Sequence, residues 1–391
     1  MMFPDRLRLK LQRMAEEGLT RRLNVLDAGT GPVISYQGRP VILLSSNDYL
    51  GLAAHPSVVR AAVHATEQYG SGAGASRLIS GTLPPHAALE AALASFKGTE
   101  AALLFSSGYL ANLGTIPTLI DRGGLILADR LCHASLIDGC RLSGADFRIY
   151  RHRDSNHVES LLKRRTPGRP TLIVTDGLFS MDGDVAPLAE LVSLANRYDA
   201  LLYVDDAHGT GVMGATGRGT LEALAVEQEI PFHMGTLGKA FGSAGAYVVG
   251  SHALINYLVN TVRPFLFTTA PPPATAAAAH VALTIIQEEP QRRVRLWANR
   301  DYLFHGLRRL GFHLTETVSP ILPIIVGDAQ TAVAFSNQLL ARGIYAPAVR
   351  PPTVPPGTSR IRVTVTSEHT TEQLEEALQA FEAVGQALRL I

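Results

Sequence analysis

Cysteine is scarce in this sequence, which has only Cys132 and Cys140. Two cysteines cannot build a disulfide framework, and their spacing matches no metal-binding cluster. The pair therefore indicates a reduced, cytoplasmic setting. No apolar stretch reaches the roughly 18 residues that a membrane-spanning helix needs, and the N-terminal residues do not form a signal peptide. We expect a protein without membrane attachment.

An excess of positive charge is also missing. Lysine and arginine together number 35 and the acidic residues 34, which gives a formal net charge of +1. Proteins that bind nucleic acid by neutralising phosphates need a basic surplus, so we expect no nucleic-acid partner. Hydrophobic residues make up 46% of the 391 positions, which is enough to bury a large core.

Short apolar runs alternate with helical patterns through the middle of the chain. A helical pattern such as Leu188–Tyr198 separates two of these runs. Near-continuous apolar runs are typical of strands buried on both faces, and their alternation with helices predicts an α/β domain with a mainly parallel sheet. We expect strands at Ala101–Phe105, Leu125–Ala128, Phe147–Tyr150, Leu172–Thr175, Leu201–Asp205 and Ala246–Val249.

The two ends of the chain have a different pattern. Asp5–Leu23 predicts an amphipathic helix at the start. After Pro271-Pro272-Pro273 we expect one long helix over about His280–Leu310, and then a smaller α+β domain. The resulting division is an N-terminal helix and arm over 1–45, a large domain over 46–275 and a C-terminal small domain over 276–391. In the small domain we expect strands at Ile321–Val326 and Ile361–Thr366 and a final helix from about Thr371.

Lys239 lies in the segment Thr236-Leu237-Gly238-Lys239-Ala240-Phe241-Gly242, just after an expected strand end. Apolar surroundings lower the pKa of an amine and favour the neutral form that a Schiff base requires. Thr236 offers a hydroxyl to a phosphate. When the segment is taken alone, an ordinary surface turn is the favoured interpretation.

An apolar strand runs into Asp205 and His208, in Val204-Asp205-Asp206-Ala207-His208. In open α/β sheets ligands bind at the carboxyl ends of strands. An aspartate at that place can pair with a pyridinium nitrogen, and His208 can reach a ring hydroxyl. A helix cap is the plainer interpretation. A metal site is disfavoured because no third ligand lies at a recognisable spacing.

Three further segments also follow expected strands. Phe105-Ser106-Ser107-Gly108-Tyr109 precedes a helical pattern, whose N-terminus can bind phosphate. His133 could stack on a cofactor ring, and Ser180 could donate a hydrogen bond to one. Each segment also has a structural explanation, as a βα turn, a surface histidine and a loop rich in turn formers.

The order of these motifs resembles that of the α-oxoamine synthases, a branch of the pyridoxal-phosphate (PLP) dependent enzymes of fold type I. The resemblance covers nearly the whole chain. It rests on Ser45–Leu52, Ser180–Asp184, Val204–Gly211 and Thr236-x-x-Lys239. It implies an aminotransferase-like fold with a large PLP-binding domain, a homodimer with shared active sites, and decarboxylative condensation of an amino acid with an acyl thioester.

The same resemblance assigns roles to matching positions. Lys239 would hold PLP as a Schiff base, Asp205 would pair with the pyridine nitrogen, and His208 with the ring oxygen. His133 would stack on the ring, assist catalysis and align the substrate. The remaining cofactor contacts would be Gly108, Tyr109, Ser180 and Thr236, with Thr268 and Thr269 reaching the phosphate from the partner subunit. The implied substrate-binding residues are Arg21, Asn47, Arg350 and Thr353.

The run Arg350-Pro351-Pro352-Thr353-Val354-Pro355 narrows the substrates. It is typical of family members that join L-alanine to pimeloyl-CoA or a pimeloyl-carrier protein in biotin biosynthesis. Ser76-Arg77 also occurs in relatives that use glycine and acetyl-CoA, so that activity is the alternative. A non-catalytic subunit would be expected to lack Lys239, and a plain aminotransferase would need no thioester.

Overall fold

The computed structural model describes residues 3–21, 23–27 and 29–391. The chain forms two compact units. Unit 1 contains the residues up to Gly51, Met181–Gly183 and Val294–Ile391, whereas unit 2 contains Leu52–Ser180 and Asp184–Arg293. The domain boundaries expected from the sequence, after residues 45 and 275, stay a prediction. Within the described part of the chain, no helix is both long and apolar enough to cross a membrane.

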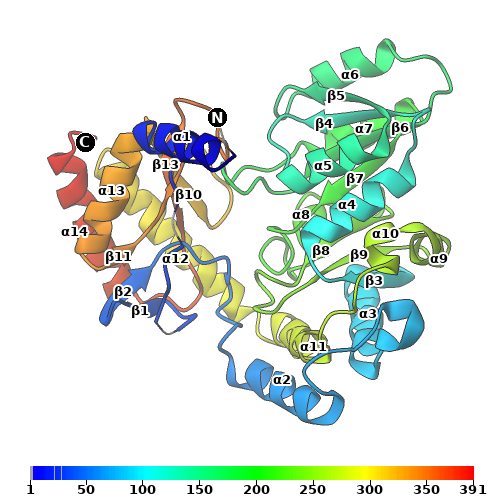
Figure 1. The fold of residues 1–391 in the computed structure, drawn as a ribbon, viewed down its shortest axis with the longest axis horizontal. Coiled ribbons are helices and arrows are strands. Elements are labelled where there is room, and N and C mark those ends of the chain that lie inside the picture. The colour runs from blue at the N-terminus through cyan, green and yellow to red at the C-terminus, as the bar shows by residue number, and fades with distance from the viewer. Residues whose placement is uncertain (1–2, 22, 28) are drawn as a thin grey trace. The chain divides into compact units, whose positions relative to one another are not determined.

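Unit 2 is built on a seven-stranded sheet (Figure 1). Its strand order is β3-β9-β8-β7-β6-β4-β5, and only β9 runs against its neighbours. The sheet is therefore mainly parallel, and all six of the strands expected in this region are present. The bounds are β3 Ala101–Phe105, β4 Leu125–Asp129, β5 Asp146–Tyr150, β6 Thr171–Asp176, β7 Leu201–Asp205, β8 His233–Thr236 and β9 Ala246–Gly250.

Helices cover both faces of this sheet. Because side chains alternate along a strand, Tyr203 packs on one face of β7 while Leu202 and Val204 pack on the other. The Tyr203 face is covered by α4 Gly108–Leu119, α5 Ala134–Ser143, α9 His252–Thr261 and α10 Arg263–Leu266. The opposite face is covered by α6 Ser155–Lys163, α7 Leu188–Arg197 and α8 Thr220–Ala223.

The remaining helices of unit 2 lie near the β3 edge of the sheet. Helices α2 and α3 both pack against α11, and α3 also packs against β3 (Figure 1). Gly98, in the left-handed conformation at φ 67°, ends α3 and lets the chain turn into β3. The bounds are α2 Pro56–Tyr69, a short π-helix Arg77–Gly81, α3 Pro84–Lys97 and α11 Pro273–Glu288.

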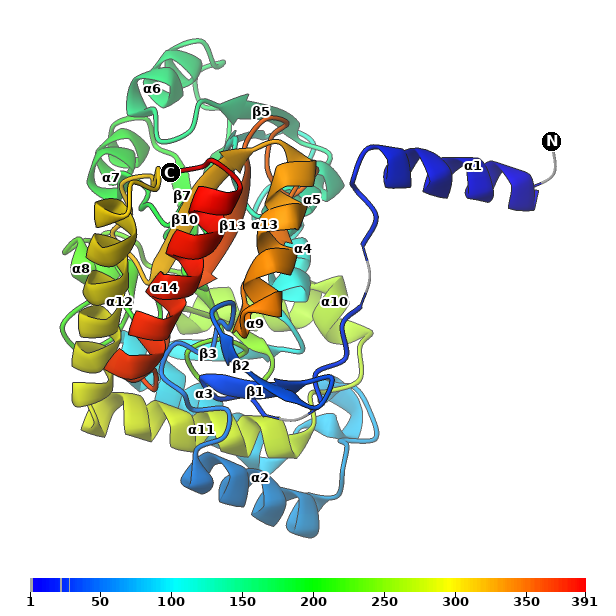
Figure 2. The same cartoon turned by 90° about the vertical axis from the view of Figure 1, so that its left-hand side faces the viewer.

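Unit 1 contains two three-stranded sheets, ordered β1-β2-β11 and β10-β13-β12. Helix α13 packs on the second sheet and against α14 (Figure 2). The two strands and the final helix expected here are present, within two residues of the predicted bounds. The bounds are α1 Phe3–Glu16, β1 Val33–Tyr36, β2 Arg39–Leu43, α12 Gln291–Arg309, β10 Ile321–Gly327, α13 Ala329–Ala341, β11 Ile344–Tyr345, β12 Ala348–Val349, β13 Ser359–Thr364 and α14 Thr371–Ala387.

Two helix predictions were wrong in extent. The single helix expected over His280–Leu310 is interrupted between α11 and α12, because Pro290 disfavours a helical conformation at Glu289, whose φ is −115° and ψ 63°. The N-terminal helix expected over Asp5–Leu23 ends at Glu16. Gly18 follows in the left-handed region at φ 67°, which is typical of a helix C-terminus.

Candidate active site

The expected cofactor motifs gather at one edge of the large sheet. Strands β3, β4, β6, β7 and β8 run in the same direction, and a motif segment follows the carboxyl end of each of them. These five strand ends carry, in chain order, Gly108 with Tyr109, His133, Ser180, Asp205 with His208, and Thr236 with Lys239. The topology thus places residues far apart in sequence at the edge where α/β sheets bind ligands.

Asp205 is the last residue of β7 and is 4% exposed. Its two carboxylate oxygens accept different donors. Oδ1 accepts the Ala207 N–H at 2.9 Å, and Oδ2 accepts the side-chain amide of Asn112 at 2.7 Å. These bonds fix the orientation of the carboxylate.

His133 is the N-cap residue of α5. Its ring nitrogen Nδ1 lies 2.7 Å from Ser135 Oγ and accepts the Ser135 backbone N–H at 3.3 Å. Burial lowers the pKa of His133, the charge of Asp205 opposes that shift, and the charge of Lys239 adds to it. His133, Asp205 and Lys239 follow or end the strands β4, β7 and β8 at the same edge of one sheet.

Asp176 ends β6 beside Asp205 and is not among the site residues expected from the sequence. Its Oδ2 accepts the His133 backbone N–H at 2.9 Å, so it holds the start of α5. Burial raises the pKa of Asp176 well above 3.8, and the neighbouring Asp205 raises it further. Register pairing of the two strands brings the carboxyls together, and a single sequence does not reveal strand order.

Lys239 lies three residues beyond β8 and is half-buried. Its turn is closed by backbone bonds from Gly242 N to Lys239 O at 2.8 Å and from Ser243 N to Leu237 O at 2.9 Å. Gly242 has φ 59°, and a Cβ there would lie 2.2 Å from Ala53 N. The glycine is thus required by a close approach of two backbones.

Thr236 is engaged within the same turn. Its hydroxyl donates to Gly245 O at 3.0 Å and accepts the Gly238 N–H at 3.3 Å. From the sequence we expect this hydroxyl to donate to a phosphate. In the structure its donor bond is directed to the backbone, so a contact of Thr236 with a phosphate requires that bond to be exchanged.

Gly108 and Tyr109 open helix α4, the element that could bind a phosphate. Ser107 caps it by accepting the Leu110 N–H at 3.2 Å. A helix N-terminus carries partial positive charge and favours an anion. The Tyr109 hydroxyl bonds Asp138, and its ring meets the His133 ring edge-on at 6.4 Å between centroids.

Ser180 and His208 occupy the loops after β6 and β7. The loop that carries Ser180 is closed by Phe179 N bonding Asp184 O at 2.9 Å and Ala186 N bonding Gly177 O at 3.0 Å. His208 is buried, with 7% of its surface exposed. Both residues therefore lie on ordered backbone at the same sheet edge as Asp205.

Thr268 and Thr269 lie between α10 and α11, away from the five strand-end motifs in sequence. Thr269 forms an isolated bridge with Ser76, and both threonines line a small recess that also includes Ser106. Within one chain they therefore lie beside the segment that precedes Gly108. Their expected action on a partner's phosphate stays a prediction.

Apart from His133, which lies in unit 2, the expected substrate residues belong to unit 1. Arg21 donates to Pro351 O at 2.9 Å, and Arg350 bonds the carbonyls of Gly18 and, at 3.2 Å, Thr20. Arg21, Arg350 and the turn that carries the exposed Thr353 are thus brought together. Asn47 is held separately, since its Oδ1 accepts a guanidinium N–H of the buried Arg362 at 3.2 Å.

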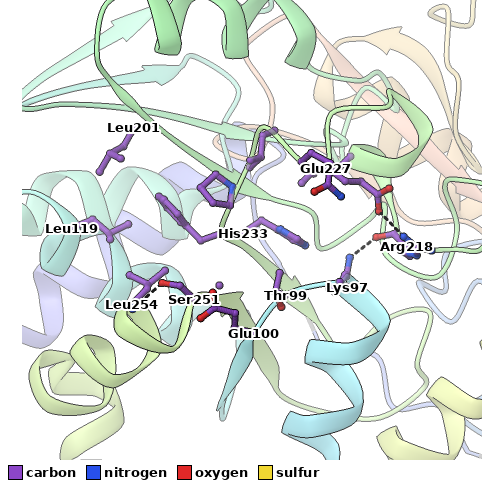
Figure 3. Close-up of a pocket in the computed structure, with 17 residues that line it drawn as sticks. Lys97, Thr99, Glu100, Leu119, Leu201, Arg218, Glu227, His233, Ser251 and Leu254 are labelled. Atoms are coloured by element: carbon purple, nitrogen blue, oxygen red, sulfur yellow. Dashed lines mark hydrogen bonds and ion pairs between the residues drawn. The ribbon is translucent and has the colours of Figure 1, made fainter.

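A cavity of about 470 Å³ lies elsewhere in unit 2 (Figure 3). It is lined by Leu201 and His233, the first residues of β7 and β8, and by Lys97, the last residue of α3. None of the expected site residues contributes to it. Volume alone therefore does not locate the motif cluster. Within residues 3–21, 23–27 and 29–391, no group of three His, Cys, Asp or Glu side chains could hold a metal ion.

Comparisons with known proteins identify the family of this chain. The family model described as aminotransferase class I and II matches residues 39–381. The chain is 49% identical over 384 residues to an 8-amino-7-oxononanoate synthase of Geobacter sulfurreducens, with 98% of each chain covered. It is 43% identical over 385 residues to 8-amino-7-oxononanoate synthase 1 of Bacillus subtilis, again with 98% of each covered.

Solved structures give the same result. A variant of serine palmitoyltransferase from S. paucimobilis with a bound PLP–myriocin aldimine has a TM-score of 0.95 at 36% identity, covering 99% of this chain and 98% of that one. An 8-amino-7-oxononanoate synthase from Francisella tularensis has a TM-score of 0.76 at 29% identity, covering 89% and 98%. The fold type I architecture expected from the sequence is thereby confirmed.

Proposed function

The chain belongs to the aminotransferase class I and II family and, within it, to the 8-amino-7-oxononanoate synthases, and we propose that the strand-end cluster of unit 2 is its PLP-dependent active site. The reaction joins L-alanine to a pimeloyl thioester. The alanine Cα forms a bond to the acyl carbon, the thiol leaves, and the carboxylate departs as CO₂. The product is 8-amino-7-oxononanoate, a biotin precursor.

The observation that carries this proposal is the convergence of Lys239, Asp205 and His133 at the carboxyl edge of one sheet. They supply the three groups that PLP needs: an amine for the Schiff base, a carboxylate for the pyridine nitrogen and a flat ring for stacking. The N-terminus of α4, opened by Gly108, is suited to the phosphate. When bound, PLP supplies an electron sink that stabilises negative charge at the alanine Cα.

The chain's own residues direct the proton transfers. Lys239 accepts the Cα proton, for which it must be neutral at that moment. The carboxylate of Asp205 is fixed by two N–H donors and would keep the pyridine nitrogen of bound PLP protonated. His133, whose pKa is lowered chiefly by burial, is neutral near pH 7 and offers a ring N–H to the acyl carbonyl.

Substrate recognition is assigned to unit 1. Two guanidinium groups lie at the Arg350–Thr353 turn. One belongs to Arg350 itself, and the other belongs to Arg21, which donates to Pro351 O. Either group can bind a carboxylate. Arg350 is the candidate for the alanine carboxylate. Arg21, Thr353 and Asn47 are assigned to the acyl substrate. These assignments rest on the family resemblance together with the proximity of Arg21 and Arg350.

The working form is proposed to be a homodimer in which Thr268 and Thr269 reach the partner's phosphate site. Thr269 is exposed in the single chain, which leaves it accessible to a partner. A reducing, cytoplasmic location is proposed because Cys132 and Cys140 are both free, buried thiols. The acyl donor is pimeloyl-CoA or a pimeloyl-carrier protein.

The test is a product assay with purified protein and PLP. One tube contains L-alanine and pimeloyl-CoA, and a parallel tube contains glycine and acetyl-CoA. We expect 8-amino-7-oxononanoate and CO₂ in the first tube. Product in the glycine tube alone would leave the PLP site intact but would overturn the substrate assignment in favour of 2-amino-3-ketobutyrate formation.

A further inference from the structure

Asn112 and Ser135 connect the two principal groups of the proposed site. Both side chains are 0% exposed, and they belong to different helices, α4 and α5. The Asn112 amide nitrogen lies 2.7 Å from Asp205 Oδ2 and 2.9 Å from Ser135 Oγ. Ser135 Oγ in turn lies 2.7 Å from His133 Nδ1. A continuous set of hydrogen bonds thus runs from Asp205 to His133.

The direction of each bond in this set follows from chemistry. A carboxylate of Asp205 can only accept, so the Asn112 group that faces it must be the NH₂. Both hydrogens of that NH₂ are then used, one on Asp205 and one on Ser135. The Asn112 oxygen accepts the Tyr203 hydroxyl at 3.0 Å. Burial raises the pKa of Tyr203 well above 10.0, so its hydroxyl stays a donor.

The bond direction determines the tautomer of His133. Ser135 Oγ accepts from Asn112 through one lone pair, and it has one hydrogen that can donate to His133 Nδ1. The Ser135 backbone N–H also points at Nδ1 and can only donate. Nδ1 is therefore an acceptor without a hydrogen, and in the neutral ring the hydrogen lies on Nε2.

We propose that Asn112 and Ser135 are positioning residues that fix the Asp205 carboxylate and the Nε2–H tautomer of His133 through this one hydrogen-bonded chain. The inference rests on the proposed function, because it takes Asp205 and His133 as the groups that face the cofactor. It explains why two buried polar side chains occur inside α4 and α5, where an apolar residue would pack more simply.

For the reaction, this chain of hydrogen bonds sets the state of His133 and of Asp205 together. The ring nitrogen that faces away from Ser135 carries the hydrogen, so His133 presents a donor to the acyl carbonyl oxygen. The same Asn112 holds the Asp205 carboxylate in place. Loss of Asn112 removes the donor that orients the Ser135 hydroxyl, so that hydroxyl can turn its hydrogen away from Nδ1. Only the longer backbone bond of 3.3 Å then opposes the Nδ1–H tautomer, which presents a lone pair on Nε2.

The test uses full-length, PLP-loaded protein with ¹⁵N-labelled histidine and the variants Asn112→Leu and Ser135→Ala. Ser143→Ala, at the other end of α5, is the matched control. We expect ring ¹⁵N shifts of the Nε2–H tautomer for His133 in the wild type and the control. Both variants should shift toward a mixture of tautomers, with kcat/KM about tenfold lower or more.

Wild-type ¹⁵N shifts and unchanged kcat/KM in both variants would overturn the proposal. Ser135→Ala removes a single oxygen, so it remains informative if Asn112→Leu does not fold. The NMR readout does not depend on which acyl substrate the protein uses. The wild type could make no 8-amino-7-oxononanoate while the two variants still show the expected change of tautomer. That result would count against the proposed function and not against this inference.

Discussion

Asp176 and Asp205 stand side by side at the ends of two parallel strands, because β6 and β7 pair in the register that sets Asp176 opposite Asp205. Both side chains are buried. Asp176 is the carboxyl whose pKa is raised well above its ordinary value, by burial first and then by Asp205. The site thus combines a fixed carboxylate with a second acid that favours its protonated form.

This relationship predicts the behaviour of Asp176→Asn. Asparagine keeps an oxygen for the His133 N–H but removes the like charge. A raised acid pKa in the folded state means that stability falls as pH rises above 3.8, so the variant should lose this dependence. We expect a Tm at pH 7 equal to or above that of the wild type. Asp176→Leu, which also removes the acceptor, should be less stable by about 1–3 kcal/mol. An Asn variant as unstable as the Leu variant would contradict this.

We expect the buried pair Lys97–Asp206 to matter for stability, because each charge offsets the cost of burying the other. Its atoms are 3.7 Å apart, Asp206 is 0% exposed, and burial lowers the pKa of Lys97 to about 8 while raising that of Asp206 to about 6. Lys97→Met leaves an uncompensated carboxylate, so unfolding in urea should show a loss of about 3–5 kcal/mol.

Two further variants make this test specific. In Lys97→Met with Asp206→Asn, most of the loss should be recovered, because no unpaired charge remains. Lys163→Met breaks the exposed pair Lys163–Glu159, at 3.2 Å, and should change stability by no more than about 1 kcal/mol. Equal losses from the buried and exposed lysines would refute the assignment.

His152 bridges two carboxylates at the edge of the proposed site. Nδ1 lies 2.9 Å from Asp129, Nε2 lies 2.9 Å from Asp184, and Arg153 also bonds Asp184 at 3.1 Å. The ring packs edge-on against Phe179, the residue before Ser180. The pKa of His152 is raised from 6.5 to about 9, since the two carboxylates outweigh burial, which taken alone is the largest influence and lowers it.

The pH dependence follows from the sign of that shift. A raised histidine pKa adds stability that is fully present below pH 6.5 and is lost as pH rises through about 9. His152→Phe should therefore lower stability by about 2–3 kcal/mol at pH 6, and the difference from the wild type should shrink by pH 10. Thermal unfolding across this range provides the measurement, with the exposed His64→Phe as control. A pH-independent difference would rule out the bridge as its cause.

Gly242 is expected to be intolerant of any side chain. It combines φ 59° with a backbone neighbour, Ala53 N, at 2.2 Å from the Cβ position. Gly168 has φ 73° but nothing within 4 Å, so it serves as a control with strain and no clash. Gly168→Ala should cost about 1–2 kcal/mol, and Gly242→Ala about 2–5 kcal/mol with weaker PLP retention, because the Lys239 turn must move. Similar stability losses for the two variants would contradict this prediction, because they would show that the backbone at Ala53 moves away from a Cβ at position 242 at little cost in free energy.

Much of the fold could be predicted because its strands are buried on both faces. Runs such as Leu125–Ala128 and Leu172–Thr175 show no polar alternation, and that pattern leaves few alternatives in an α/β chain. The prediction of helix ends was wrong where a single proline or glycine interrupts a helix although the apolar pattern continues. Pro290 interrupts the apolar pattern that suggested a single helix, and Gly18 ends α1 before the pattern does.

The site was predictable only in part. The strand-end motifs with Lys239 and Asp205 could be recognised by their order, which a family resemblance preserves. Asn112, Ser135 and Asp176 were not assigned roles, because a polar residue inside a helix or at a strand end has the same appearance whether or not it reaches another segment. Their contacts span 23 and 43 residues of sequence or more, and only the register of β4, β6 and β7 with α4 and α5 brings them together.

The most direct test of the central claim is to locate the covalently bound cofactor. The chain has four lysines, Lys10, Lys97, Lys163 and Lys239, so the result is unambiguous. The PLP-loaded protein is reduced with borohydride, digested, and analysed by peptide mass spectrometry, with Lys239→Ala in parallel. The account predicts one pyridoxyl group on the peptide that contains Lys239 and none in the variant. A pyridoxyl group on another lysine, or its persistence in Lys239→Ala, would contradict it.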